Sequence, residues 1–253
     1  MGVVDTHCHL FLSDHEPPEL VERARAAGVD RLICVGVDPQ TSRRSLELAE
    51  SIDGVFATAG MHPHDASAFD AAAGARIEEL LSEPLVLAVG ECGLDFYRRL
   101  SSPEDQERAL KAQIVMSNET GKPLVVHVRD AWPDVLRVLD EGSAEHVVIH
   151  CFSGTPDVAR ECAARGYWIS FAANVTYPKN DHLRAAAAAV DVDRIVVETD
   201  SPFLAPQRLR GRANEPANVV DALEEIARAR GDEVEAIRRA TSSNARAAFP
   251  GLP

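Results

Sequence analysis

The stretch VVDTHCHL at residues 3–10 decides the fold, because a short apolar run ends in polar side chains and helical sequence follows it. Seven further runs rich in Val, Ile and Leu have the length of buried strands. They are RLICVGVD (31–38), GVFATAGMH (54–62), LVLAVGECG (85–93), PLVVHVRD (123–130), HVVIHCFSG (146–154), YWISFAAN (167–174) and RIVVETDSP (194–202). We therefore expect eight strands.

Helical patterns separate these strands. Apolar residues recur at helical spacing in segments 19–28, 106–121, 156–166 and 181–190, and several of these segments end in Gly. Strands that alternate with helices form parallel sheets covered on both faces. Eight such units predict an α/β protein with a closed (β/α)8 TIM barrel. Two last helical segments, about 217–230 and 232–245, are expected to close it.

A doubly wound open sheet is the competing fold. No G-x-G-x-x-G motif follows the first strand, and polar residues stand at nearly every strand end rather than at one switch point. Both observations favour the barrel. No repeat or linker divides the chain, so residues 1–253 are expected to form a single domain with closing helices at its C-terminal end.

Composition limits the class of protein. Hydrophobic residues make up 45% of the chain and charged residues 26%, as in ordinary globular proteins. No apolar segment approaches the ~18 residues of a membrane span, and no export signal is visible, so we expect a cytoplasmic protein without a membrane partner. Five cysteines without C-x-x-C spacing indicate reduced thiols. A net charge of −14 opposes nonspecific binding along nucleic acids.

Residues able to bind metals or move protons gather at the C-terminal ends of the expected strands, where TIM barrels carry their active sites. Each residue alone has a simpler interpretation, such as a capping role for Glu91 or Asp200. However, only three of the nine histidines lie elsewhere, so the joint placement is the evidence. The residues at these ends are His7, His9, His62, His64, Glu91, His127, His150 and Asp200.

The cysteines beside these residues are expected to have no chemical role. Side chains alternate between the two faces of a strand, so His7 and His9 should face one way and Cys8 the other. Cys92 and Cys151 follow Glu91 and His150 in the same manner. We therefore expect all three cysteines to be small buried hydrophobic residues rather than ligands.

Six of the candidate ligands are too many for one tetrahedral zinc and about right for two metals that share a bridging carboxylate. Imidazole-rich sites suit Zn²⁺, Mn²⁺, Co²⁺ or Ni²⁺ better than Mg²⁺. We therefore expect two divalent ions, with Zn, Mn, Mg, Co and Ni all open. The six residues are His7, His9, Glu91, His127, His150 and Asp200.

Seven ordered motifs carry a resemblance to a known family. They are THCHL, GMHPH, GECGLDFYR, VVHVRDA, IHCFSG, ETDSPFLAP and RGRANEP. In this order they resemble the motifs of the TatD family of metal-dependent deoxyribonucleases, which belongs to the amidohydrolase superfamily. The resemblance extends from Asp5 to the terminal SSNARAAF.

The resemblance implies a role for each matching residue. One metal would be held by His7, His9 and Asp200, the second by His127 and His150, with Glu91 as the bridge. His62 and His64 match the G-x-H-P motif and would lie beside the substrate. Asp95 and Arg129 would orient the substrate or the ligands.

The same resemblance implies hydrolysis of DNA phosphodiesters from a 3′ end, with single-stranded DNA or 3′ ends as the substrate. Two cations would lower the pKa of a shared water, and Asp200 would accept its proton. Loop arginines could hold flanking phosphates, although salt bridges to carboxylates would occupy them equally well. With 5% aromatic residues, stacking on long strands should be modest. The arginines are Arg98, Arg99, Arg129, Arg208, Arg210 and Arg212.

Two other functions stay open. An amidohydrolase or lactonase would use the same metals to attack a carbonyl carbon of a small neutral molecule. Many relatives in that superfamily bridge their metals with a carbamylated lysine, so Glu91 in the bridging place favours the nuclease. A metal-storing or scaffold protein would need blocked metal positions, which nothing in the loops suggests. No protein partner is evident.

Overall fold

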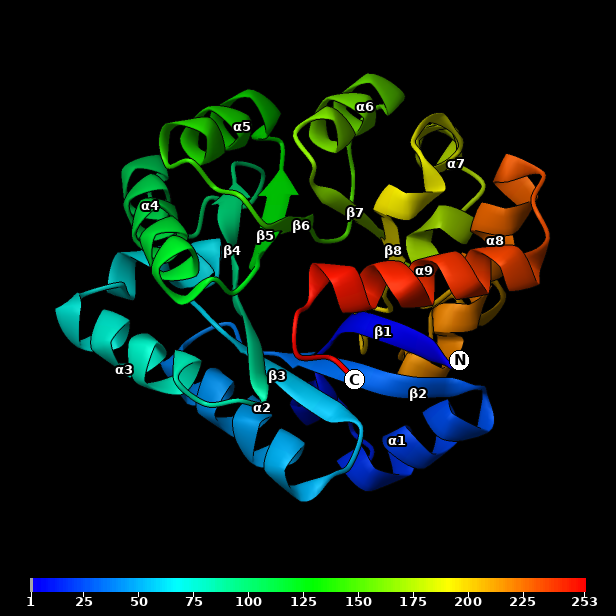
Figure 1. Cartoon of the computed structure of the whole chain (residues 1–253), viewed down its shortest axis with the longest axis horizontal. Coiled ribbons are helices and arrows are strands. Elements are labelled where there is room, and N and C mark those ends of the chain that lie inside the picture. The colour runs from blue at the N-terminus through cyan, green and yellow to red at the C-terminus, as the bar shows by residue number, and fades with distance from the viewer. Residues whose placement is uncertain (1) are drawn as a thin grey trace.

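The computed structural model describes residues 2–253 as a ring of eight parallel strands surrounded by helices (Figure 1). The strands pair in chain order from first to last. This order confirms the (β/α)8 barrel, because a doubly wound sheet would reverse its strand order. The strands are β1 (Val3–Cys8), β2 (Val29–Val35), β3 (Val55–Ala59), β4 (Val86–Asp95), β5 (Leu124–Arg129), β6 (Val147–Ile149), β7 (Trp168–Phe171) and β8 (Ile195–Val197).

Seven helices connect successive strands, and two follow the last strand. Short 3-10 turns, including η1 (Leu10–Leu12) and η3 (Ala173–Thr176), lie in the loops. The helices are α1 (Pro17–Ala26), α2 (Pro39–Ser51), α3 (Ala71–Leu81), α4 (Pro103–Thr120), α5 (Trp132–Glu141), α6 (Pro156–Ala164), α7 (Asp181–Ala189), α8 (Val219–Arg230) and α9 (Val234–Ala248).

Local signals set the helix ends. The Asp38 side chain accepts a hydrogen bond from the Thr41 amide at 2.7 Å, and the Thr41 hydroxyl pairs with the Asp38 backbone, which forms a capping box for α2. Ser102 caps α4, and Pro103 occupies its first turn, where no amide donor is needed. Gly121 then ends α4 at φ +67°, a conformation that favours glycine.

The barrel closes between β1 and β8. The backbone of Cys8 bridges that of Ser201, and the His9 amide donates to the Ser201 carbonyl at 2.8 Å. The Asp200 amide donates to the His7 carbonyl at 2.9 Å. This seam brings residues from the two ends of the chain into register.

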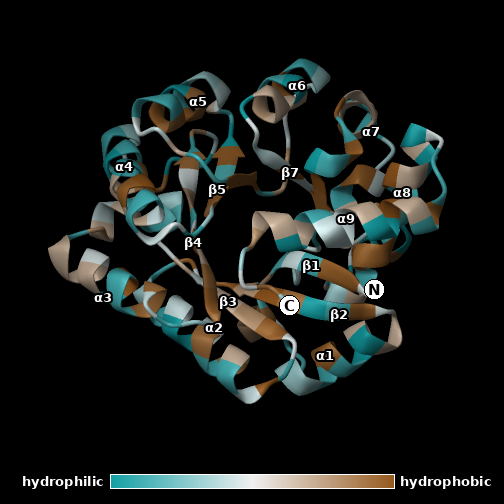
Figure 2. Cartoon of the chain, viewed as in Figure 1, coloured by the Kyte–Doolittle hydropathy of each residue, from teal (hydrophilic) through white to brown (hydrophobic). Residues whose placement is uncertain are grey.

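The core has two layers. A larger apolar cluster fills the space between the strands and the helices, and a smaller one fills the barrel itself. Figure 2 shows the strands as largely hydrophobic, while the helices carry both hydrophobic and hydrophilic residues. The barrel cluster includes Val4, Ile33, Val35, Phe56, Leu87, Val125 and Val196.

Helix α9 covers the end of the barrel where the strands begin, and α8 takes a place in the outer ring (Figure 1). The Ser242 hydroxyl donates to the Gly2 carbonyl at 2.9 Å, and the Asn244 amide donates to the Ile195 carbonyl at 2.8 Å. Phe249, which is fully buried, belongs to the barrel cluster. The end of the chain therefore seals the barrel opposite the C-terminal ends of the strands.

We expect Phe249→Ala to lower the free energy of unfolding by about 3–5 kcal/mol, because it leaves a cavity inside the barrel. Denaturant unfolding measures this effect. Val234→Ala, at a position of α9 that is 39% exposed, is the control and should change stability by less than about 0.5 kcal/mol. Equal stability of both variants would contradict the sealing role of Phe249.

Within residues 2–253, no helix has the length and apolar character needed to cross a bilayer.

Candidate metal centre

All six predicted ligands meet at the C-terminal end of the barrel. His7, Glu91 and His127 lie within β1, β4 and β5, near the end of each strand. The remaining residues follow their strands directly or within three positions. Four of the six are buried, and the other two, His127 and Asp200, are partly exposed. The centre is thus largely enclosed by protein, and solvent reaches two of its six residues.

A β-bulge in β1 decides which side chains enter this site. Val4 points into the barrel, so strict alternation would turn His7 outward and Cys8 inward. The register with β2 shifts between Asp5 and Cys8, and an extra residue at such a bulge reverses the alternation. Cys8 consequently packs in the outer layer, while His7 and His9 face the site.

The first group of donors lies at the barrel seam. The Nε2 atoms of His7 and His9 are 3.3 Å apart, and Asp200 Oδ1 lies 3.6 Å from His9 Nε2 and 3.9 Å from His7 Nε2. Two ligands on one tetrahedral zinc stand roughly 3.4 Å apart. His9 Nδ1 donates to the Val35 carbonyl at 3.0 Å, which leaves its Nε2 free to bind a cation. The donor set therefore fits a metal ion.

The second group of donors surrounds Oε1 of Glu91. Its Oε1 lies 3.0 Å from His127 Nδ1, 3.4 Å from His62 Nε2 and 3.6 Å from His150 Nε2. Its Oε2 lies 3.3 Å from His7 Nε2, in the first group. The two oxygens thus face different sets of nitrogens, as a bridging carboxylate requires.

His62 lies closer to this group than we expected from the sequence. It forms a potential ligand set with Glu91 and His127, whereas its motif suggested a place beside the substrate. Its position three residues after β3 allows the ring to reach inward. His62 is therefore a further candidate ligand.

The electrostatics of the site suit a cation. Burial opposes ionisation of Glu91, but the imidazoles around it, His150 foremost, hold the pKa of its carboxyl well below the usual range. Burial also opposes ionisation of Asp200, and contact with His9 lowers its pKa. Burial lowers the pKa of His7, which favours the neutral imidazole that binds metals. Burial also opposes the charged form of His150, but Glu198 and Glu91 raise the pKa of its imidazole to about 10. Anionic carboxylates thus stand among nitrogen donors for which a bound cation would compete with protons.

Asp95 contacts the outer edge of the second group. Its Oδ2 lies 2.8 Å from His64 Nε2 and 3.5 Å from His127 Nε2. Its Oδ1 accepts the amides of Tyr97 at 3.0 Å and Arg98 at 2.7 Å. Asp95 therefore orients His127 from behind and fixes the loop that follows β4. His64 contacts Asp95 and packs edge-on against the His62 ring, but it belongs to none of the potential ligand sets among residues 2–253.

The structure adds Glu198, a residue we did not select from the sequence. Its Oε1 lies 2.8 Å from His150 Nδ1 and accepts the Cys151 amide at 2.9 Å, and its Oε2 accepts the Ser170 hydroxyl at 2.6 Å. This buried carboxylate turns His150 Nε2 toward Glu91. The sequence did offer a signal for Glu198: it stands two residues before Asp200 in the ETDSP motif, and residues two apart on a strand share a face.

The prediction for the cysteines is correct for two residues and wrong for the third. Cys8 and Cys92 are buried in the outer layer, and their thiols donate to backbone carbonyls. Cys151 is only half-buried and forms a potential ligand set with His150 and Glu198. Strand alternation does not apply to it, because β6 ends at Ile149 and residue 151 adopts φ +43°.

The loop arginines differ in their partners. Arg208 forms an ion pair with Asp221 at 2.7 Å, as the alternative interpretation predicted. The guanidinium of Arg129 lies 4.2 Å from the Tyr97 ring centre, and that of Arg210 lies 4.2 Å from the Tyr177 ring centre. Of the six loop arginines selected from the sequence, the five other than Arg208 form no ion pair within residues 2–253. Arg129, at the exposed end of β5, follows the candidate ligand His127 by two residues.

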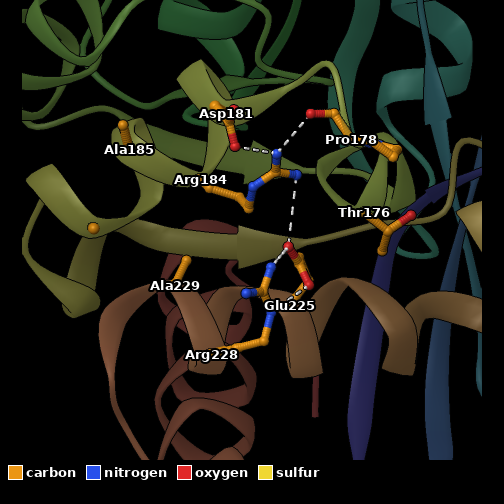
Figure 3. A pocket seen from close by; sticks show the side chains of 9 residues that line it. Thr176, Pro178, Asp181, Arg184, Ala185, Glu225, Arg228 and Ala229 are labelled. Carbon is orange, nitrogen blue, oxygen red and sulfur yellow. Dashed lines mark hydrogen bonds and ion pairs between the residues drawn. The ribbon is translucent and has the colours of Figure 1, made fainter.

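A separate groove of about 410 Å³ lies on the outside of the barrel beside α7 and α8 (Figure 3). Arg184 contacts Asp181, and its Nη1 lies 3.6 Å from Glu225, which also pairs with Arg228. These charges neutralise one another within the groove. None of its lining residues belongs to a potential ligand set.

Comparison with known protein families covers nearly the whole chain. The sequence model described as TatD related DNase matches residues 4–250. The chain belongs to this family. A relative from Bacillus subtilis, the uncharacterized metal-dependent hydrolase YabD, is 36% identical over 249 residues, which are 97% of this chain and 98% of that protein. The 3'-5' ssDNA/RNA exonuclease TatD of Cronobacter turicensis is 39% identical over 243 residues, with 93% and 92% covered.

Solved TatD structures share the fold. YJJV, a TatD homolog from Escherichia coli, has a TM-score of 0.91 at 25% identity, with 98% of this chain and 97% of that chain covered. A TatD family hydrolase from Entamoeba histolytica has a TM-score of 0.89 at 18% identity, with 99% of both chains covered. The expected TatD resemblance and the assignment as a hydrolase acting on ester bonds are confirmed.

We expect Glu91→Gln to lower the metal content of both groups, because one substitution removes charge from both. Elemental analysis of gently purified protein should approach two equivalents for the unmodified chain and fall well below one for the variant. Glu79→Gln, at an exposed residue paired with Arg43, is the matched control and should retain full content. Full occupancy in Glu91→Gln would exclude Glu91 as the bridge.

Glu198→Gln should weaken metal binding at the second group about 10- to 100-fold, because residues that orient a ligand commonly contribute this much to affinity. Titration of the metal-free protein with Zn²⁺ or Mn²⁺ measures the change. The same titration of Glu225→Gln, outside the barrel, should give the unmodified affinity. An unchanged affinity in Glu198→Gln would show that His150 needs no orienting carboxylate.

Proposed function

We propose that this chain is a deoxyribonuclease that removes nucleotides from the 3′ end of single-stranded DNA, with two divalent ions bound at the candidate metal centre. The observation that carries this proposal is the position of Glu91, whose two oxygens face different nitrogen donors of two adjoining groups. Such an arrangement suits phosphodiester hydrolysis, in which charge develops on both the attacking and the leaving oxygen. The names of several relatives, 3'-5' ssDNA/RNA exonucleases, support the substrate and direction.

The proposed metal ligands are those expected from the sequence, with Zn, Mn, Mg, Co or Ni as the ions. His7, His9 and Asp200 would hold one ion, His127 and His150 the other, and Glu91 would bridge them. Bound metals would lower the pKa of a water and neutralise charge on the phosphate. Asp200 is ionised and 15% exposed, so it can accept a proton from a water molecule at the mouth of the site.

Residues around the centre would position the substrate. Asp95 fixes the His64 ring and the loop that carries Tyr97, so this side of the mouth is preformed. Arg129 extends from the end of β5, where its charge can hold a phosphate beside the scissile one. His64 would line the site on the side of β3, together with His62, which is also a further candidate ligand of the second group.

The rest of the chain agrees with this role. We propose that residues 1–253 form one hydrolase domain that acts in the cytoplasm, and no protein partner is evident. The five free cysteines support a reducing compartment. The charge of −14 is compatible with DNA if the metals and nearby arginines dominate the field within a Debye length, about 8 Å at physiological salt.

The deciding experiment compares DNA with neutral substrates. Metal-reconstituted protein is incubated with a 5′-labelled single-stranded oligonucleotide, a copy blocked by 3′-terminal phosphorothioates, and a panel of lactones, esters and amides. A ladder that shortens from the 3′ end only in the unblocked strand supports the proposal. Turnover of lactones or amides with intact DNA would instead establish the small-molecule hydrolase, and an RNA strand of the same sequence tests the sugar preference.

We expect substrate capture to fall only gently with salt, since few phosphates are contacted and added salt also relieves repulsion from the acidic surface. Each neutralised phosphate on a single strand contributes a slope of roughly −0.7. Arg129→Ala should raise KM several-fold. It should also make the dependence of log affinity on log salt shallower by roughly 0.7, the contribution of one phosphate. Arg160→Ala, at an exposed ion pair with Asp157, is the control. Capture that rises with salt in both variants would contradict an anionic substrate.

A further inference from the structure

Exposed apolar side chains gather at the mouth of the site. Six large apolar residues are exposed within residues 2–253, and four of them lie in loops that follow β1, β4 and β8. Only two of the six are aromatic, Tyr97 at 62% exposure and Phe203 at 52%. The six residues are Leu12, Tyr97, Leu100, Val115, Phe203 and Val234.

Phe203 lies beside the first metal group. Its amide donates to the Asp200 carbonyl at 2.9 Å, so a short turn ties it to a candidate ligand. The Phe203 ring centre is 6.1 Å from that of His9, with the planes inclined by 69°. The Asn214 amide donates to the Pro202 carbonyl at 2.9 Å, which holds the turn from the other side. The turn is thus held next to the centre, and the ring that it carries is open to solvent.

Tyr97 lies beside the second metal group. Its amide donates to Asp95, whose other oxygen contacts His64 and His127. The guanidinium of Arg129 stacks over the Tyr97 ring at 4.2 Å. A cation in this position covers part of the ring, yet most of the side chain stays exposed. The pair offers a flat aromatic surface and a positive charge in one place.

Exposure of these rings has an energetic cost, because an exposed aromatic side chain forgoes the hydrophobic stabilisation that burial would give it. The chain contains few aromatic residues, and its other phenylalanines, tyrosines and tryptophans are buried or half-buried. Two exposed rings on anchored loops at two sides of one centre therefore match a ligand with flat faces on two sides of one phosphate.

We propose that Phe203 and Tyr97 are base-binding platforms on which the nucleobases flanking the scissile phosphate stack, one on each ring. The inference rests on the proposed nuclease function and identifies what recognises the single strand. Base stacking on aromatic side chains tolerates any sequence, because every base has a flat face. In a duplex the faces are covered by neighbouring base pairs, so only an unpaired strand can offer both. Arg129 supports the Tyr97 platform and would lie near the sugar-phosphate backbone of the bound strand.

The test combines protein variants with base deletions in the substrate. Phe203→Ala and Tyr97→Ala are compared with Phe203→Tyr, which keeps a flat ring, and with Leu100→Ala, an exposed apolar residue of the same loop region as Tyr97. Substrates are short single-stranded oligonucleotides with all bases, or with a tetrahydrofuran abasic unit at the last or the penultimate nucleotide. Elemental analysis confirms equal metal content, and Phe203→Leu replaces any Phe203→Ala protein that loses metal.

Each alanine variant should raise KM for the complete strand about 5- to 100-fold, the equivalent of about 1–3 kcal/mol for one stacked base. The kcat should stay within about threefold, because the metal groups are unchanged. Loss of affinity should be smaller on the substrate that lacks the corresponding base, and Phe203→Tyr and Leu100→Ala should behave as the unmodified protein. Fluorescence anisotropy with a phosphorothioate strand should show the same changes in Kd without turnover.

The outcomes separate this inference from the function on which it rests. Cleavage of the complete strand by both alanine variants with unmodified KM would overturn the base platforms and leave the nuclease intact. An equal loss on complete and abasic strands would also overturn them, because the rings would then act on something other than a base. Failure of the unmodified protein to cleave any strand would overturn both proposals together.

Discussion

The buried carboxylate of Glu91 is the constraint on which the centre depends. It is 3% exposed, and a charge removed from water in this way is stable only with close partners. Four imidazoles from β1, from the loop after β3, from β5 and from the end of β6 lie within 3.6 Å of its oxygens. A parallel barrel supplies them, because all its strands end at the same rim. The negative charge of Glu91 at the middle of that rim would be neutralised by a bound cation.

Further carboxylates stand behind the imidazoles and hold them in place. Asp95 lies behind His127, and Glu198 lies behind His150, so each ring has one nitrogen toward Glu91 and the other toward an acid. The ring orientation is thereby determined before any ligand arrives. Asp95 also anchors the Tyr97 loop, so a single residue connects the second group of donors with the surface at its mouth.

The fold and the composition of the centre could be predicted because both depend on local pattern: apolar strands alternate with helices, and polar residues stand at the strand ends. Other features depend on pairing between distant segments. The inward turn of His7 needs the β1 bulge, a property of its register with β2. Cys151 is half-buried because β6 ends at Ile149, before the end of the apolar run from which the strand was predicted. The Arg208 ion pair needs Asp221, which α8 places beside it.

The seam between β1 and β8 has a consequence for the nascent chain. The first group of donors takes His7 from the beginning of the sequence and Asp200 from its last quarter, and their backbones are joined by a hydrogen bond. A ribosome must therefore release the eighth strand before the group can assemble. Partly synthesised chains carry the early histidines without Asp200, so the first group of donors is complete only after nearly the entire barrel has been translated.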